Sequence, residues 1–347
     1  MKKTTHGKKT MLLLAFCGGA ICVAGILVFY GTGSLLAVVA AVAAFVLLLN
    51  IALRSLGGLI TRRYNVNAWL KRICVVLLVI LSVITFVYGT LYVVQDSMFF
   101  YINHDPESRE YLLRTEGYHE VQFTAENGKT YHGMIHRAND DTAPLVIYFG
   151  GNGEVSYRNL RSREAQNQWQ YFEGYHYLYV DYEGYGLNDG QTHYLNMYEQ
   201  ALAVYDYASA LTYVDESRIV AMGYSLGTGS AVYLAANRPV TGLILATPYA
   251  NGYDLYNNML PIFYGPMRLL VKQKLPSESY APSVTCPVLI IASLSDEVIP
   301  YSTSERLSRL FPGDVDFMTL DNALHNFIFQ TDGVFEKVRF FLLNTPT

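Results

Sequence analysis

The sequence contains few cysteines, and their positions exclude most disulfide and metal chemistry. Only four occur in 347 residues, and three of them (Cys17, Cys22 and Cys74) lie in long apolar stretches. Cys286 is therefore the single cysteine of the polar part of the chain, which cannot form an internal disulfide. The chain also lacks a Cys-x-x-Cys pair and a His-Glu-x-x-His sequence. We therefore expect neither a structural nor a catalytic zinc site.

Positive charge is scarce after residue 96. Residues 97–347 contain 16 of the 25 Lys and Arg residues but 28 of the 29 Asp and Glu residues, a formal net charge of −12. An acidic domain of this kind repels the phosphate backbones of nucleic acids. We therefore expect no nucleic-acid partner.

Acidic residues are missing from the first 95 positions, where three long apolar runs are found instead. The runs cover about 11–30, 35–53 and 73–94, and each is long enough to cross about 30 Å of hydrocarbon as a helix. Lysines precede the first run, as in a signal peptide, but no small-residue cleavage site precedes the second run. We therefore predict an uncleaved membrane region over 1–96 with three transmembrane helices.

Lysine and arginine in the short loops predict how these helices are oriented. The N-terminal tail contains four such residues, the 31–34 link contains none, and the link between the second and third runs contains five. The tail and the second link are therefore expected in the cytoplasm. Three crossings then place residues 97–347 outside, which predicts an integral protein of the plasma membrane with an extracytoplasmic domain.

The rest of the chain alternates apolar strands with helical segments. Two alternating segments joined by Asn127-Gly128 predict a β-hairpin over 119–136. The apolar runs that follow are typical of buried parallel strands covered by helices on both faces. We predict an α/β fold with functional residues at the carboxyl ends of its strands. The predicted strands are 144–149, 175–181, 218–224, 242–247, 287–292 and 315–320, with helices near 157–168, 197–211, 230–237, 302–310 and 333–343.

A serine stands between two glycines where a predicted strand meets a predicted helix. The segment reads Gly223-Tyr-Ser-Leu-Gly227. This pattern predicts a nucleophile elbow, a strained turn that exposes the serine hydroxyl, and the glycines are needed because larger side chains would collide where strand and helix cross. We therefore predict Ser225 as the nucleophile and the backbone N–H of Leu226 as one oxyanion donor.

A nucleophilic serine needs a histidine to take its proton and a carboxylate to orient that histidine. Of the eight histidines only His325 follows Ser225, in a loop after the last predicted strand. Asp296 follows the preceding predicted strand and is our predicted carboxylate, with Asp254 as the alternative. The neighbouring Glu297 is expected to be solvated.

The second oxyanion donor is expected from the loop after strand 144–149. This loop reads Gly150-Gly-Asn-Gly-Glu154, and its glycines let backbone N–H groups face a substrate. The donor is predicted to be Gly151 or Asn152, and both stay open. The structural alternative is a plain tight turn.

With these residues in place, positions 97–345 resemble the membrane-anchored branch of the α/β-hydrolase domain-containing serine hydrolases. The resemblance rests on five segments: 146–154, 181–190, 223–227, 295–300 and His325-Asn326. It implies an α/β-hydrolase fold and serine-dependent cleavage of acyl esters or thioesters without a cofactor. The family usually has His-Gly in the oxyanion loop, and Gly150 replaces that histidine here, which implies altered acyl-site geometry. Asp181 and Asp189 match a family loop and are expected to be structural.

An insertion over 249–280 is rich in aromatic and aliphatic residues. It is interpreted as a small cap with its own core, or as an acyl pocket or lid near the bilayer. We predict an esterase, lipase or thioesterase that forms an acyl-enzyme from an acyl ester or lipid-like substrate and loses activity on acidification, as His325 protonates. The alternatives are a catalytically silent membrane scaffold or binding protein, and a serine peptidase or amidase.

Overall fold

The computed structural model describes residues 39–48, 50–51 and 67–345 and divides the chain into two compact units, Met1–Phe99 and Phe100–Thr347. In the first unit, helix α3 (Ala68–Phe99) contains the whole of the predicted third span. Its part Arg72–Phe99 is long and apolar enough to cross a membrane. Length and composition therefore support one candidate span in the described part of the chain.

The other two predicted spans are not established. Of the predicted span 35–53 the structure describes residues 39–48 and 50–51, which are helical, and the predicted span 11–30 lies outside the described residues. Asn50, the polar residue of the second run, donates from Nδ2 to Ser82 Oγ of α3 at 2.7 Å. Such pairs satisfy a polar group between apolar helices.

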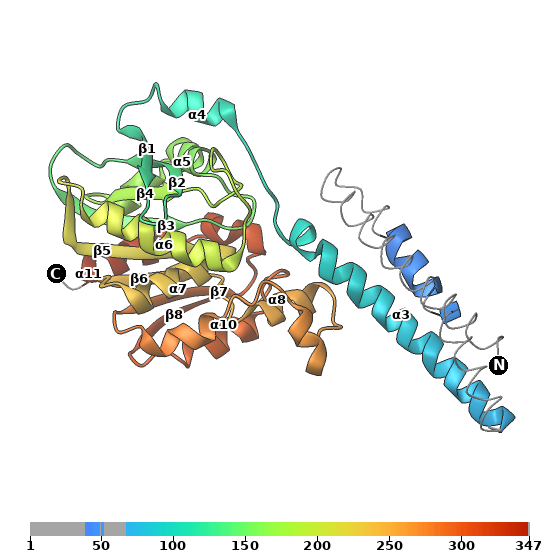
Figure 1. Cartoon of the computed structure of the whole chain (residues 1–347). Coiled ribbons are helices and arrows are strands. Elements are labelled where there is room, and N and C mark those ends of the chain that lie inside the picture. The colour runs from blue at the N-terminus through green and yellow to red at the C-terminus, as the bar shows by residue number, and fades with distance from the viewer. Residues whose placement is uncertain (1–38, 49, 52–66, 346–347) are drawn as a thin grey trace. The chain divides into compact units, whose positions relative to one another are not determined.

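The second unit is built on an eight-stranded sheet with the order β1-β2-β4-β3-β5-β6-β7-β8 (Figure 1). Strands β1 and β2 form the predicted hairpin, with Gly128 of its turn at φ +80°, and β2 pairs antiparallel with β4. All later pairs are parallel, as expected for apolar strands separated by helices. The strands are β1 Tyr118–Thr124, β2 Thr130–His136, β3 Ala143–Phe149, β4 His176–Val180, β5 Val214–Tyr224, β6 Gly242–Ala246, β7 Val288–Ser293 and β8 Val315–Leu320.

Helices cover both faces of this sheet, as predicted. The second unit contains α4 Pro106–Leu112, α5 Ser156–Ala165, η1 Gln168–Phe172, α6 Tyr194–Ser209, η2 Ser225–Gly227, α7 Thr228–Asn237, α8 Gly252–Met259, η3 Gly265–Leu270, α9 Ser277–Tyr280, η4 Ala281–Ser283, α10 Tyr301–Ser308, η5 His325–Gln330 and α11 Val334–Asn344. Strand β5 begins earlier than predicted, because its polar start pairs with β3 through Val214 and Ala143.

The two faces of the sheet have different cores. Leu145 and Ile147 of β3 pack with aliphatic residues of α6 and α7. Tyr148 alternates to the other face, where the ring packs with Tyr177 and with the buried guanidinium of Arg163 from α5. The aliphatic face therefore supports the helix after β5, and the aromatic face supports the helix after β3.

Candidate active site

The candidate nucleophile lies at the junction between β5 and α7. Ser225 has a left-handed backbone φ of +50°, the strained geometry of a sharp strand-to-helix turn. A Cβ on Gly223 would lie 2.7 Å from the Gly227 carbonyl oxygen, and a Cβ on Gly227 would lie 2.1 Å from the Phe149 carbonyl oxygen. Only glycine therefore fits on either side of this turn, which has the geometry of the predicted nucleophile elbow.

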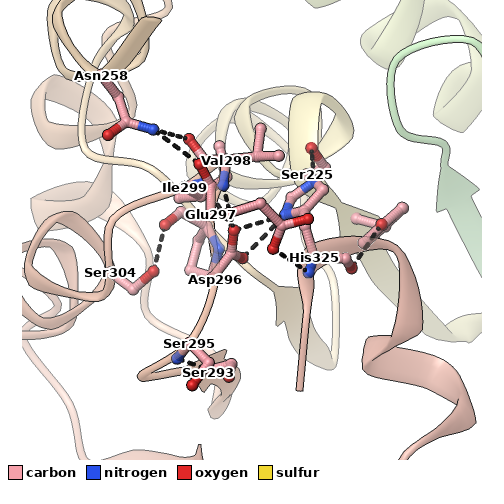
Figure 2. A network of polar contacts seen from close by, with 12 residues as sticks. Ser225, Asn258, Ser293, Ser295, Asp296, Glu297, Val298, Ile299, Ser304 and His325 are labelled. Atoms are coloured by element: carbon pink, nitrogen blue, oxygen red, sulfur yellow. Dashed lines mark hydrogen bonds and ion pairs between the residues drawn. The ribbon is translucent and has the colours of Figure 1, made fainter. Parts of the chain in front are cut away.

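A chain of hydrogen bonds joins the serine to a histidine and a carboxylate (Figure 2). His325 Nε2 lies 2.9 Å from Ser225 Oγ, and His325 Nδ1 lies 2.8 Å from Asp296 Oδ2. Because a carboxylate only accepts, Nδ1 carries the proton and Nε2 can accept one from the serine. The structure thus brings Ser225, His325 and Asp296 together at the carboxyl edge of the sheet, and all three side chains are buried.

The loop after β7 holds the carboxylate and also contacts the histidine backbone. Asp296 Oδ1 accepts the N–H groups of Val298 and Ile299 at 2.9 and 2.8 Å, which fixes the carboxylate in the turn. Glu297 Oε2 accepts the backbone N–H of His325 at 2.9 Å (Figure 2). Glu297 is exposed, as expected of a solvated carboxylate, and this contact with His325 is an addition that the sequence did not predict. It arises because β7 and β8 are parallel neighbours whose following loops meet.

The alternative acid has other partners. Asp254 Oδ2 accepts the Thr303 hydroxyl at 2.6 Å and forms an ion pair with Arg306. These contacts join α8 to α10, which gives the Asp254 carboxylate a structural role. The histidine contacts Asp296 instead.

Two tyrosines that no sequence signal marked support the candidate catalytic groups. The Tyr224 hydroxyl donates to the His325 carbonyl at 3.0 Å, and its ring stacks on the imidazole. The Tyr249 hydroxyl donates to the Leu226 carbonyl at 2.8 Å. Leu226 lies in the first turn after the nucleophile, where N–H groups have no partners within the helix and can meet an anion.

The loop after β3, residues 150–154 (the oxyanion loop), lies against the nucleophile. A Cβ on Gly151 would lie 3.6 Å from Ser225 Cβ. The Gly151 N–H donates to Glu154 Oε2 at 2.7 Å, and the Gly151 carbonyl accepts the Glu154 N–H at 3.2 Å. Both backbone groups of Gly151 therefore face Glu154.

The contacts between Gly151 and Glu154 bear on which of the two predicted N–H groups, that of Gly151 or that of Asn152, can reach an oxyanion. The N–H of Gly151 is already bound to a carboxylate. All peptides in the described part of the chain are trans, so the N–H of Asn152 points to the side opposite the Gly151 carbonyl, away from Glu154. The geometry favours Asn152 over Gly151 as the second donor.

The glycine at position 150, where the resemblance led us to expect a histidine, has a packing explanation. A Cβ on Gly150 would lie 1.8 Å from the Tyr179 hydroxyl oxygen, so the ring from β4 fills the space of a side chain. The Gly150 carbonyl accepts the Tyr182 hydroxyl at 2.9 Å. Tyrosines from β4 and the following loop therefore fix the position of the oxyanion-loop backbone at Gly150.

Asp181 also acts on this side of the site. Its carboxylate accepts the backbone N–H and the hydroxyl of Ser156, the first residue of α5, at 2.6 and 2.9 Å. Burial raises the pKa of Asp181 to about 7, although the two Ser156 hydrogen bonds lower it. Asp181 therefore anchors the helix that follows the oxyanion loop. Asp189, by contrast, is exposed.

In the ranges that the structure describes, no group of three or more His, Cys, Asp or Glu side chains is placed to hold a metal ion.

Comparisons with known proteins agree with this architecture. No protein-family model matches the chain. An uncharacterized protein of Mycobacterium tuberculosis is 31% identical over 206 residues, 59% of this chain and 71% of that protein. The alpha/beta hydrolase domain-containing protein aho-3 of Caenorhabditis elegans is 28% identical over 162 residues, 47% of each protein. The solved structure of the Pyrococcus furiosus esterase Pf2001 matches 71% of this chain and 98% of the esterase chain, with a TM-score of 0.56 and 17% sequence identity. This match shows a common fold.

Proposed function

Because this chain belongs to the α/β-hydrolase superfamily, we propose that it is a membrane-anchored serine hydrolase that cleaves acyl esters or thioesters. The observation that supports this proposal most strongly is the hydrogen-bonded series from Ser225 Oγ to His325 and Asp296, with spacings of 2.9 and 2.8 Å. Proton transfer needs spacings of this kind.

The proposed reaction follows from these contacts. His325 Nε2 takes the Ser225 proton as Oγ attacks the acyl carbon, and the N–H groups of Leu226 and Asn152 hold the resulting oxyanion. The imidazolium then gives its proton to the departing alcohol or thiol, which leaves Ser225 acylated. Water, deprotonated by His325, attacks the acyl-enzyme and releases the acid.

Apolar residues around 249–280 support an acyl or lipid-like substrate. Tyr256 and Phe263 are buried and pack edge to face, so the cap has a small core of its own. Leu269, Met259 and Tyr264 are 80%, 58% and 57% exposed. We assign these exposed side chains to the approach of an apolar substrate or of the bilayer.

Two measurements test the reaction and its substrate. The full-length protein is treated with a fluorophosphonate, which labels an activated serine, and Ser225→Ala is expected to abolish both labelling and ester turnover. Labelling that is unchanged in Ser225→Ala would assign the nucleophile to another residue. p-Nitrophenyl esters of increasing chain length then report the acyl specificity. A wild-type protein that neither reacts nor turns over any ester favours the scaffold alternative.

The proposed topology places the second unit on the extracytoplasmic side of the plasma membrane. It is supported by the loop charges described above and by the candidate span Arg72–Phe99. A C-terminal reporter that is active only outside the cytoplasm is expected to be active. A second C-terminal reporter, active only in the cytoplasm, is tested in parallel. If this second reporter is the active one, the proposed orientation is wrong.

A further inference from the structure

Residues 101–104, here called the strap, follow α3 in the chain, belong to the second unit and lie against the oxyanion loop. The Tyr101 N–H donates to Asn152 Oδ1 at 2.9 Å. The Asn103 side chain donates from Nδ2 to the Gly153 carbonyl at 3.0 Å. The strap therefore contacts two consecutive residues of the loop, one of which is the favoured oxyanion donor.

The strap is also fixed to the loop after β4. The Asn103 carbonyl accepts the Gly186 N–H at 3.2 Å, and His104 Nδ1 lies 2.8 Å from the Gly186 carbonyl oxygen. Because a carbonyl oxygen only accepts, His104 Nδ1 carries the proton. These bonds give the strap a defined course before α4 begins at Pro106.

The same loop supplies a second donor to Asn152. The hydroxyl of Tyr185, a fully buried side chain, donates to Asn152 Oδ1 at 2.8 Å. One amide oxygen thus accepts from the strap and from Tyr185, which uses both of its lone pairs. Two donors from different segments restrict the Asn152 side chain to one orientation.

We infer that the Asn152 side chain is a positioning element for the reaction: held by the strap and Tyr185, it directs its own backbone N–H toward the oxyanion. This inference rests on the proposed function and adds a role for a side chain that does not touch the substrate. The inference also gives a role to the residues that follow the candidate membrane helix. Helix α3 ends at Phe99, and Tyr101, two residues later, donates one of the hydrogen bonds that hold the Asn152 side chain.

The test uses the full-length protein in detergent, with active sites counted by fluorophosphonate titration. Asn152→Ala is expected to lower kcat per titrated site about 10–100-fold, less than outright loss of an oxyanion donor, with KM for a p-nitrophenyl ester changed less than about threefold. The Ki of an alkyl boronic acid, whose serine adduct is a tetrahedral anion, should rise in proportion. Asn152→Asp keeps oxygen acceptors for both donors and is expected to restore most of kcat.

A second variant covers the case in which Asn152→Ala folds poorly. Tyr185→Phe removes one donor and keeps the ring, and it is expected to lower kcat about 3–10-fold. Its effect should be less than additive with Asn152→Ala because both act through one oxygen. Tyr171→Phe is the matched control: it removes an exposed hydroxyl that donates to Glu336, and it should leave kcat unchanged.

The outcomes separate this inference from the proposed function. If the wild type is labelled at Ser225 but Asn152→Ala and Tyr185→Phe keep the wild-type kcat per site and boronate Ki, the positioning role is overturned and the hydrolase proposal stands. A fall in the number of titratable sites with unchanged kcat per site also overturns it, because that result reports folding. If Ser225→Ala is labelled like the wild type, the proposed function fails and the inference fails with it.

Discussion

The two sides of the candidate site are built from different chemical groups. On the acid–base side, Ser225, His325 and Asp296 contact one another through their side chains at 2.8–2.9 Å. On the oxyanion side, the candidate groups belong to the backbone, and side chains such as Glu154 and Tyr182 hold the oxyanion loop through hydrogen bonds to that backbone. Substitutions should therefore abolish the reaction on the first side and weaken it on the second.

The largest expected effect is on the acid–base side. Asp296→Asn replaces the acceptor of the His325 Nδ1 proton with a group that can favour the wrong tautomer, and it is expected to lower kcat about 10⁴-fold. Steady-state kinetics per titrated active site measure this. Asp254→Asn is the matched control, because Asp254 contacts Thr303 and Arg306, and it should change kcat less than about threefold. A larger loss in Asp254→Asn than in Asp296→Asn would reverse the assignment of the acid.

The next effect is on stability and lies on the oxyanion side. Burial raises the pKa of Asp181 from 3.8 to about 7, so the folded chain keeps this proton to higher pH than the unfolded chain. Stability from this group therefore falls as pH rises from about 4 to about 7, by at most about 4 kcal/mol. Asp181→Asn removes this penalty and can still bond Ser156, so it should be more stable than the wild type at pH 8.

Thermal unfolding at several pH values measures the difference. The Tm of Asp181→Asn should exceed that of the wild type by up to about 10 °C at pH 8, and the two should converge near pH 4–5. Asp189→Asn, in the same loop but exposed, is the control and should follow the wild type at every pH. A constant offset between wild type and Asp181→Asn would show that the proton of Asp181 does not set the difference.

A moderate effect is expected where a side chain holds the oxyanion backbone. Glu154 Oε2 accepts the Gly151 N–H and the Tyr148 hydroxyl at 2.7 and 3.0 Å. Glu154→Ala frees the Gly151 peptide to rotate and should lower kcat about 10–100-fold. Glu154→Gln keeps an oxygen acceptor and should lose less. A loss in Glu154→Ala equal to that of Asp296→Asn would mean that the two sides of the site do not differ as described.

Much of the fold and of the acid–base side could be predicted because the signals are local or unique. Asn127-Gly128 specifies the hairpin turn, with Gly128 at φ +80°. The glycines around Ser225 specify a close crossing of strand and helix. His325 is the only histidine after the serine, so chain order alone selected it.

The details of the oxyanion side could not be predicted in this way. The choice between Gly151 and Asn152 depends on how Glu154 folds back on the loop, which the spacing does not specify. Position 150 is a glycine because the Tyr179 ring from another strand fills the space of a side chain, a packing relation between residues distant in sequence. The helix α4 did carry a local signal, since Asp105 caps it and Pro106 begins it.

The smallest predicted effect comes from the contact that links the two loops of the acid–base side. Glu297 Oε2 accepts the His325 backbone N–H at 2.9 Å, but the residue is exposed, so water can replace the carboxylate at modest cost. Glu297→Ala should lower kcat less than about tenfold, and Glu297→Gln, which keeps an oxygen acceptor, should match the wild type. Kinetics of both variants decide this. Equal losses of kcat in both variants would show that the negative charge of Glu297 matters, because the charge is the only feature that both variants lack. The acid–base side would then include Glu297 as well as Ser225, His325 and Asp296.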